Sequence, residues 1–170
     1  MMFLPQYPYL PLGTLRGAAA YPQGPDAFSE AEIVAAMEKV GLAEFRDMLD
    51  VEERWDRILS LGQQQRLAFV RLLLHKPLWV FLDEATGALD EANQTRVMTL
   101  VNEELSESTI VSIGHRPSLA AFHNRTLNLV PTPSGARLRR RQHPTVTAGW
   151  LQSVLGKMWK PRRPTPGDRI

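Results

Sequence analysis

The strongest constraint on the fold is an unbroken apolar run, LWVFL at residues 78–82, which leads directly into two carboxylates, Asp83 and Glu84. A short run of aliphatic and aromatic residues predicts a strand covered on both faces. TIVSIG (109–114) has the same character, and TLNLV (126–130) alternates apolar and polar residues. With helical segments between these runs, the order predicts an α/β domain built on a mostly parallel sheet.

The segments before and between the predicted strands carry helix signals. Ser29 and Glu32 form a capping box for a helix that ends near Gly41. Residues 62–75 are too apolar for a surface helix, so we expect a buried helix that ends at Pro77. Five prolines make residues 1–28 loop-like. Short helical turns are expected over residues 14–20, 43–49 and 117–122, and a longer helix is expected after Asp90.

Polar side chains follow the first two predicted strands. Ligands bind a parallel sheet at the carboxyl ends of its strands, where Asp83, Glu84 and His115 all lie. One carboxylate can hold Mg²⁺ while the next polarises an attacking water, and the histidine can contact a phosphate oxygen. The alternatives are a solvated acidic turn and a structural histidine. No second histidine or cysteine is spaced to share a metal with His115.

The stretch LSLGQQQR (59–66) opens the buried helix. Ser60 and Gly62 place a hydroxyl and free backbone amides at the positive end of the helix dipole, which suits a phosphate. In the simpler alternative, Ser60 only caps the helix.

Taken together and in order, these motifs resemble the nucleotide-binding domain of ABC transporters, over residues 3 to about 131. The matching segments are the Q-loop FLPQYPYLPLGTLR with Gln6, the signature LSLGQQQR, the Walker B strand WVFLDEATGALD, its D-loop Asp90, and the switch histidine of SIGHR, His115. The implied fold is a P-loop NTPase-like domain with the family's α-helical subdomain.

The resemblance implies a role for each matching residue. Gln6 and Asp83 would bind Mg²⁺. Glu84 would be the general base, and His115 would contact the γ-phosphate of ATP. The signature residues would clasp the γ-phosphate of ATP bound to the opposite subunit, and Asp90 would bridge the two ATP sites. Those signature residues are Ser60, Gly62 and Gln63.

Two features depart from the commonest family pattern. Leu61 stands where the commonest signature has its first glycine. This variant of the signature is similar to that of half-transporters related to peroxisomal fatty-acyl carriers and their bacterial counterparts. In addition, no GxxxxGK[ST] sequence, the P-loop that cradles the phosphates, occurs in the 170 residues. We therefore expect a domain truncated before the Q-loop, in which strand 78–82 loses a sheet neighbour and exposes apolar surface.

Charge separates a body from a tail. Residues 1–130 hold 11 Lys and Arg against 17 Asp and Glu, whereas residues 131–170 hold 9 against 1. We therefore predict a partial ABC ATPase domain over 1–130, divided at 76/77 between the signature helix and the Walker B region, and a basic, proline-rich tail over 131–170. ARLRRRQH (136–143) and the amphipathic stretch 150–160 would suit anionic lipid, and the alternative is a solvated extension. No apolar run is long enough to span a membrane.

The predicted function is that of an ATP-hydrolysing subunit or fragment of an ABC transporter, using ATP and Mg²⁺. Its partners would be a transmembrane domain and a second ATPase domain, at the cytoplasmic face of a membrane. One alternative is a non-hydrolysing partner module or a truncated relic. A soluble ABC ATPase acting on nucleic acid or the ribosome is another alternative, and the Q-loop sequence favours the transporter over it.

Overall fold

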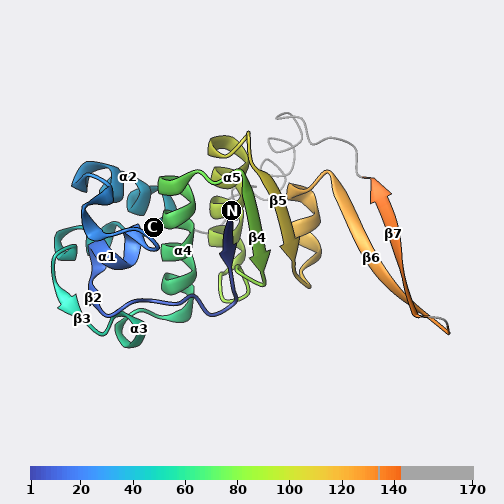
Figure 1. Cartoon of the computed structure of the whole chain (residues 1–170), viewed down its shortest axis with the longest axis horizontal. Coiled ribbons are helices and arrows are strands. Elements are labelled where there is room, and N and C mark those ends of the chain that lie inside the picture. The colour runs from blue at the N-terminus through green and yellow to red at the C-terminus, as the bar shows by residue number, and fades with distance from the viewer. Residues whose placement is uncertain (134, 143–170) are drawn as a thin grey trace, which may run out of the picture. The chain divides into compact units, whose positions relative to one another are not determined.

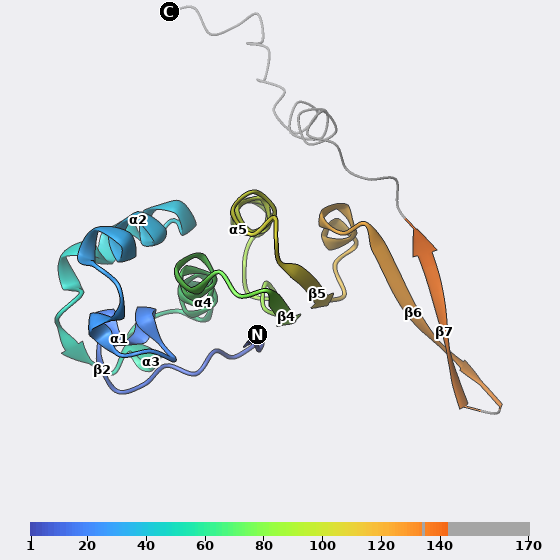
Figure 2. The same cartoon turned by 45° about the horizontal axis from the view of Figure 1, so that its top comes forward.

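The computed structural model describes residues 1–133 and 135–142, which fall into two compact units, Met1–His115 and the part of the chain from Arg116 onward. The first unit contains a three-stranded parallel sheet in the order β1 (Met2–Leu4), β4 (Trp79–Asp83), β5 (Thr109–Ile113). Two long helices, α4 (Leu61–His75) and α5 (Glu91–Glu104), lie along one face of this sheet (Figures 1 and 2). The predicted α/β class with a parallel sheet is confirmed for this unit.

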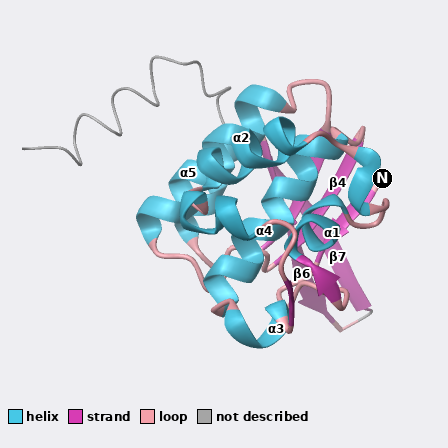
Figure 3. Ribbon diagram, turned by 90° about the vertical axis from the view of Figure 1, so that its left-hand side faces the viewer, coloured by secondary structure: helices cyan, strands magenta, loops and turns pink. Residues whose placement is uncertain are grey.

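Helices dominate the chain between β1 and β4 (Figure 3). α1 (Leu15–Ala20) begins at its cap Thr14, and α2 (Glu30–Val40) has the predicted Ser29–Glu32 capping box and ends at Gly41 in the left-handed region. Both helices pack against α4, so α4 is buried along most of its length. The remaining elements here are η1 (Pro25–Ala27), η2 (Ala43–Met48), α3 (Trp55–Ile58), and the short antiparallel pair β2 (Gly13–Thr14) and β3 (Glu52–Glu53).

One expectation about the sheet is wrong. Strand β4 does not lose a neighbour, because β1 pairs with it on one side and β5 pairs with it on the other. A three-residue strand ahead of Pro5 carries too little pattern to be predicted from sequence, and the first segment was expected to be a loop.

The sheet is covered on one face only within the first unit. Val80 and Leu82 face the helices and are buried, whereas Phe3, Trp79 and Ile113 are exposed on the opposite face. The prediction that β4 is covered on both faces is therefore wrong in this chain, and the predicted exposure of apolar surface is confirmed.

The second unit contains a short helix and a hairpin. The helix η3 (Pro117–Phe122) precedes β6 (Arg125–Thr132), which pairs antiparallel with β7 (Gly135–Gln142). The strand at 126–130 therefore forms as predicted, but among the described residues its partner is β7 rather than the parallel sheet. This pairing crosses the predicted boundary at 130/131, which stays a prediction. The amphipathic stretch 150–160 lies outside the described residues.

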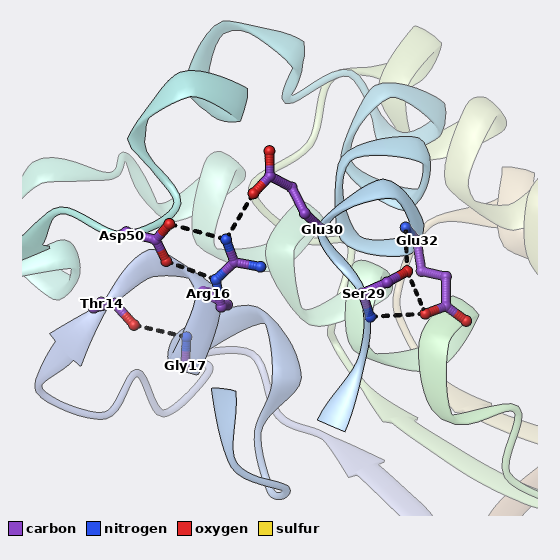
Figure 4. A network of polar contacts seen from close by, with 7 residues as sticks. All are labelled: Thr14, Arg16, Gly17, Ser29, Glu30, Glu32 and Asp50. Carbon is purple, nitrogen blue, oxygen red and sulfur yellow. Dashed lines mark hydrogen bonds and ion pairs between the residues drawn. The ribbon is translucent and has the colours of Figure 1, made fainter. Parts of the chain in front are cut away.

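A charged network joins α1 and α2 to the loop before β3 (Figure 4). The Arg16 guanidinium donates to both oxygens of Asp50, at 2.6 and 2.9 Å, and to Glu30 at 2.9 Å. The backbone amide of Arg16 also donates to Leu49 O at 2.8 Å. Arg16 therefore ties three segments of the helical part together.

The Arg16 network predicts a stability loss that depends on salt and pH. We expect Arg16→Met to lower the thermal unfolding midpoint at pH 7, and the loss to shrink at about 1 M salt because exposed charges are screened. Arg16 holds the pKa of Asp50 below its ordinary value of 3.8. The pair therefore stabilises the folded state fully above that pH, and this contribution is lost as the pH falls through the lower pKa of the folded state.

Thermal scans by circular dichroism from pH 7 down to pH 3 would check this prediction. Arg46→Met is the matched control, because Arg46 reaches its carboxylate partners only at 3.9 and 3.7 Å. An equal loss for both variants would contradict the assigned role of Arg16.

Candidate functional site

The carboxyl ends of β4 and β5 bring Glu84 and His115 together. Asp83 is the last residue of β4 and pairs with Ile113, the last residue of β5. One residue further on, the Glu84 amide donates to Ile113 O at 2.9 Å. His115 Nε2 lies 2.8 Å from Glu84 Oε1, with the two side chains 87% and 31% exposed. A solvent-accessible carboxylate–imidazole pair thus stands at this edge of the sheet, where sequence patterning predicted it.

The backbone at Glu84 is held in an unusual conformation. Its φ of 49° lies in the left-handed region, which costs a residue with a side chain about 1–3 kcal/mol. Two hydrogen bonds fix the turn: the Glu84 amide bonds β5, and the Gly87 amide donates to Glu84 O at 2.9 Å. A strained backbone persists only where the surrounding structure holds it in place, and such residues are concentrated at functional sites.

Gln6 reaches the same edge from β1. It follows that strand by two residues, and a Cβ built on Gly87 would lie 3.8 Å from Gln6 Nε2 and 3.2 Å from Glu84 O. Gln6, Asp83, Glu84 and His115 therefore lie at the carboxyl ends of three adjacent strands. The sequence predicted this position for Asp83, Glu84 and His115 but not for Gln6, because no strand was expected before it.

The signature residues form the start of α4. Ser60 is the helix cap: its Oγ accepts from the Gln63 amide at 3.3 Å, and Gln63 Oε1 accepts from the Ser60 amide at 2.9 Å. Ser60 therefore caps the helix, and its contact with a phosphate stays a prediction. Gly62 is packed so closely that a Cβ there would lie 3.1 Å from Ala88 O, in the turn after Glu84. The side chains of Ser60 and Gln63 hydrogen-bond each other at 3.0 Å.

Asp90 begins the next helix, as predicted. Its Oδ1 accepts from the Asn93 amide at 2.7 Å and its Oδ2 accepts from Asn93 Nδ2 at 3.0 Å. The hydrogen bond from the Asn93 backbone keeps the pKa of Asp90 below its usual value. The carboxylate is thus charged and exposed at the N-terminus of α5.

Sequence patterning did not single out Gln65, which is buried between these segments. Its side chain contacts the backbone of Gln6 and of Ala88. The only sequence signal is a polar residue on the apolar side of a buried helix. Three consecutive glutamines at 63–65 hide that signal.

An adjacent carboxylate pair with an imidazole at the carboxyl end of a parallel sheet, beside a helix N-terminus, suits the hydrolysis of a bound nucleotide. Comparison with known proteins agrees. Residues 12–87 match the family model described as ABC transporter.

Curated relatives share sequence over about three quarters of the chain. An ABC transporter ATP-binding protein of Haemophilus influenzae is 47% identical over 128 residues, covering 75% of this chain and 22% of the relative. The lysosomal cobalamin transporter ABCD4 of Mus musculus is 39% identical, and the match covers 76% of this chain and 23% of that protein. ABC transporter D family member 2 of Arabidopsis thaliana is 36% identical, and the match covers 76% of this chain and 22% of that protein. The chain thus spans about a fifth of the length of these relatives.

A solved structure also matches the fold. A bacterial Atm1-family ABC exporter with ATP bound superposes with a TM-score of 0.63 at 33% sequence identity, covering 74% of this chain and 22% of that one. Over the matched residues, the chain is therefore similar to part of the ATPase domain of ABC transporters. The relatives include members of the D family, which agrees with the branch that Leu61 and the Q-loop sequence indicated.

ABC ATPases use ATP with Mg²⁺, and the residues here fit that pair. Among the described residues no group of three or more His, Cys, Asp or Glu could hold a metal alone. Mg²⁺ characteristically takes one or two protein oxygens and completes its shell with phosphate oxygens and water. The Asp83 carboxylate and the Gln6 amide oxygen supply suitable ligands. Within the described part of the chain, no helix is long and apolar enough to cross a bilayer.

Proposed function

We propose that this chain supplies the hydrolytic edge and the signature helix of an ABC transporter ATPase site that drives transport. The observation that supports the proposal best is the 2.8 Å contact between His115 and Glu84 at the carboxyl ends of adjacent parallel strands. A charged base needs a partner that orients it, and the imidazole provides one.

Each residue at this edge receives a proposed role. Glu84 accepts a proton from the attacking water, and His115 orients Glu84 and contacts the γ-phosphate. Asp83 and Gln6 hold Mg²⁺, directly or through water. When bound, the metal ion offsets the charge that develops on the phosphate oxygens.

The signature helix would act on a second nucleotide. Ser60, Gly62 and Gln63 occupy the first turn of a 15-residue helix, where backbone amides and the dipole favour an anion. We propose that they contact the γ-phosphate of ATP held by a second ATPase domain, and that Asp90 links the two sites. The required partners are that domain and a transmembrane domain, which would place the chain at the cytoplasmic face of a membrane.

The 170 residues contain no P-loop sequence, so the β- and γ-phosphates need a P-loop from outside them. A replacement protein tests the proposal directly. The 128 matching residues of the Haemophilus influenzae relative would be exchanged for those of this chain, which are 47% identical. We expect the replacement protein to hydrolyse ATP with Mg²⁺ in membranes.

Two variants of the replacement protein sharpen the test. Ser60→Arg should abolish hydrolysis by filling the phosphate-facing helix start, whereas Arg46→Met, in an exposed turn, should leave it unchanged. A folded replacement protein with no ATPase activity would overturn the proposed function and would favour the non-hydrolysing partner module.

A further inference from the structure

Gln65 is a fully buried polar side chain, 0% exposed, and is the fifth residue of the signature helix α4. A buried amide costs several kcal/mol unless its donors and acceptors are paired. The other buried residues of this helix are mostly apolar, and a leucine would fill a similar volume without that cost. A glutamine at this buried position therefore indicates that its amide group has specific hydrogen-bond partners.

Both ends of the Gln65 amide are used. Nε2 donates to Gln6 O at 2.8 Å, and Oε1 accepts from the Ala88 amide at 3.0 Å. A third contact, from Nε2 to Glu84 O, is 3.5 Å long and is weak at best. A backbone carbonyl can only accept and a backbone amide can only donate, so the partners require one donor and one acceptor at fixed positions. The glutamine amide presents both in the neutral form that suits a buried position.

The partners of Gln65 are backbone groups of the segments that carry the proposed chemistry. Gln6 follows β1, and its side chain lies near Gly87. Ala88 lies in the turn that follows Glu84, and its carbonyl is the atom that a Cβ on Gly62 would approach to 3.1 Å. A single side chain on α4 thus fixes the loop after β1 and the turn after β4 relative to the signature helix.

We propose that Gln65 is a positioning residue, which locks the Gln6 and Ala88 backbones to α4 and so holds Glu84 and Gln6 in the geometry that hydrolysis requires. Gln65 touches neither nucleotide nor metal. The proposal rests on the proposed function, and it adds a physical link between the signature helix and the edge that carries the base. Loss of the link moves reacting groups by fractions of an ångström, and misplacement of about 1 Å can cost about 100-fold in rate.

The first test uses the 170-residue chain without substitution. Ala88 is exposed and lies outside any helix or strand, so without the Gln65 bond its amide would exchange with solvent rapidly. We expect hydrogen exchange followed by NMR to show slow exchange at Ala88. Free exchange at Ala88 would overturn the proposal without any variant being made.

The second test compares matched glutamines. Gln65→Met keeps the length of the side chain and removes both bonds, and Gln65→Glu keeps the acceptor for Ala88 but loses the donor to Gln6 O. Gln64→Met is the control, because Gln64 also uses its side-chain amide to bond backbone groups one residue earlier, donating to Asp56 O and Leu59 O at 2.9 Å. Circular dichroism would establish that each variant is folded.

In the replacement protein described above, Gln65→Met should lower kcat about 10- to 100-fold with KM for ATP within about twofold. Gln64→Met should stay within about twofold in both. Equal kinetics for folded Gln65→Met and the unaltered protein would overturn the positioning role. If Gln65→Met does not fold, Gln65→Glu decides by the same criterion, and slow exchange at Ala88 must still be observed. An inactive unaltered protein together with a protected Ala88 amide would instead count against the proposed function.

Discussion

Glu84→Gln is expected to lower kcat for ATP hydrolysis by about 100- to 10,000-fold in the replacement protein, because a general base contributes about that much. The amide keeps the shape of the side chain and the strained turn, but it cannot accept the proton of the attacking water. It also removes the negative charge that pairs with His115 at 2.8 Å. ATP binding needs none of these properties, so binding should survive.

Two measurements separate loss of chemistry from loss of structure. Steady-state ATPase rates give kcat, and ATP-dependent dimerisation, followed by size-exclusion chromatography, reports nucleotide binding. Glu103→Gln is the matched control, since Glu103 is an exposed carboxylate near the end of α5, away from this edge. A Glu84→Gln rate within about tenfold of the unaltered protein would exclude Glu84 as the base.

Local rules account for what the sequence predicted well. The Ser29–Glu32 capping box, the Asp90 cap and the left-handed Gly41 each depend on residues within four positions of one another. The placement of Glu84 beside His115 needed one further rule, that carboxyl ends of parallel strands meet at one edge. The helix caps follow from short-range chemistry and the placement of Glu84 beside His115 from a general rule of parallel sheets, so one sequence was enough to predict both.

Long-range partners account for what the sequence did not predict. β1 has three residues, and its pairing with β4 joins Phe3 to Phe81, far away in the chain. Likewise, nothing in TLNLV distinguishes a strand of the parallel sheet from a strand of a hairpin with β7. The uncovered face of the sheet was not predicted for the same reason. The apolar run LWVFL predicts a strand that can be covered on both faces, but it does not show which neighbouring elements are present to cover it.

The three glutamines of the signature show the limit most clearly. Successive residues of a helix are rotated by about 100°, so identical side chains meet different surroundings. Gln63 completes the capping box, Gln64 bonds backbone carbonyls of the segment that precedes α4, and Gln65 enters the core. Sequence alone assigned only Gln63, by resemblance, and the role proposed for Gln65 depends on which way its position faces.

Trp55→Ala should produce the largest loss of stability in the chain, about 3–5 kcal/mol in the free energy of unfolding. Trp55 is 1% exposed, meets Phe45 edge to face with ring centroids 6.3 Å apart, and donates from its indole nitrogen to Val51 O at 3.2 Å. The substitution leaves a large cavity in the helical part and removes the hydrogen bond to Val51 O. Chemical denaturation of the 170-residue chain, followed by far-UV circular dichroism, would measure the loss.

Trp79→Ala is the control, because it makes the same substitution where burial is only partial. Trp79 is 50% exposed on the open face of the sheet and stacks on Phe81 with centroids 6.4 Å apart, so its removal should cost about 1 kcal/mol. If burial by the helices provides most of the stability, the two losses must differ several-fold. Equal losses would mean that the outer face of the sheet is covered in solution, because only a covered Trp79 could contribute as much as Trp55.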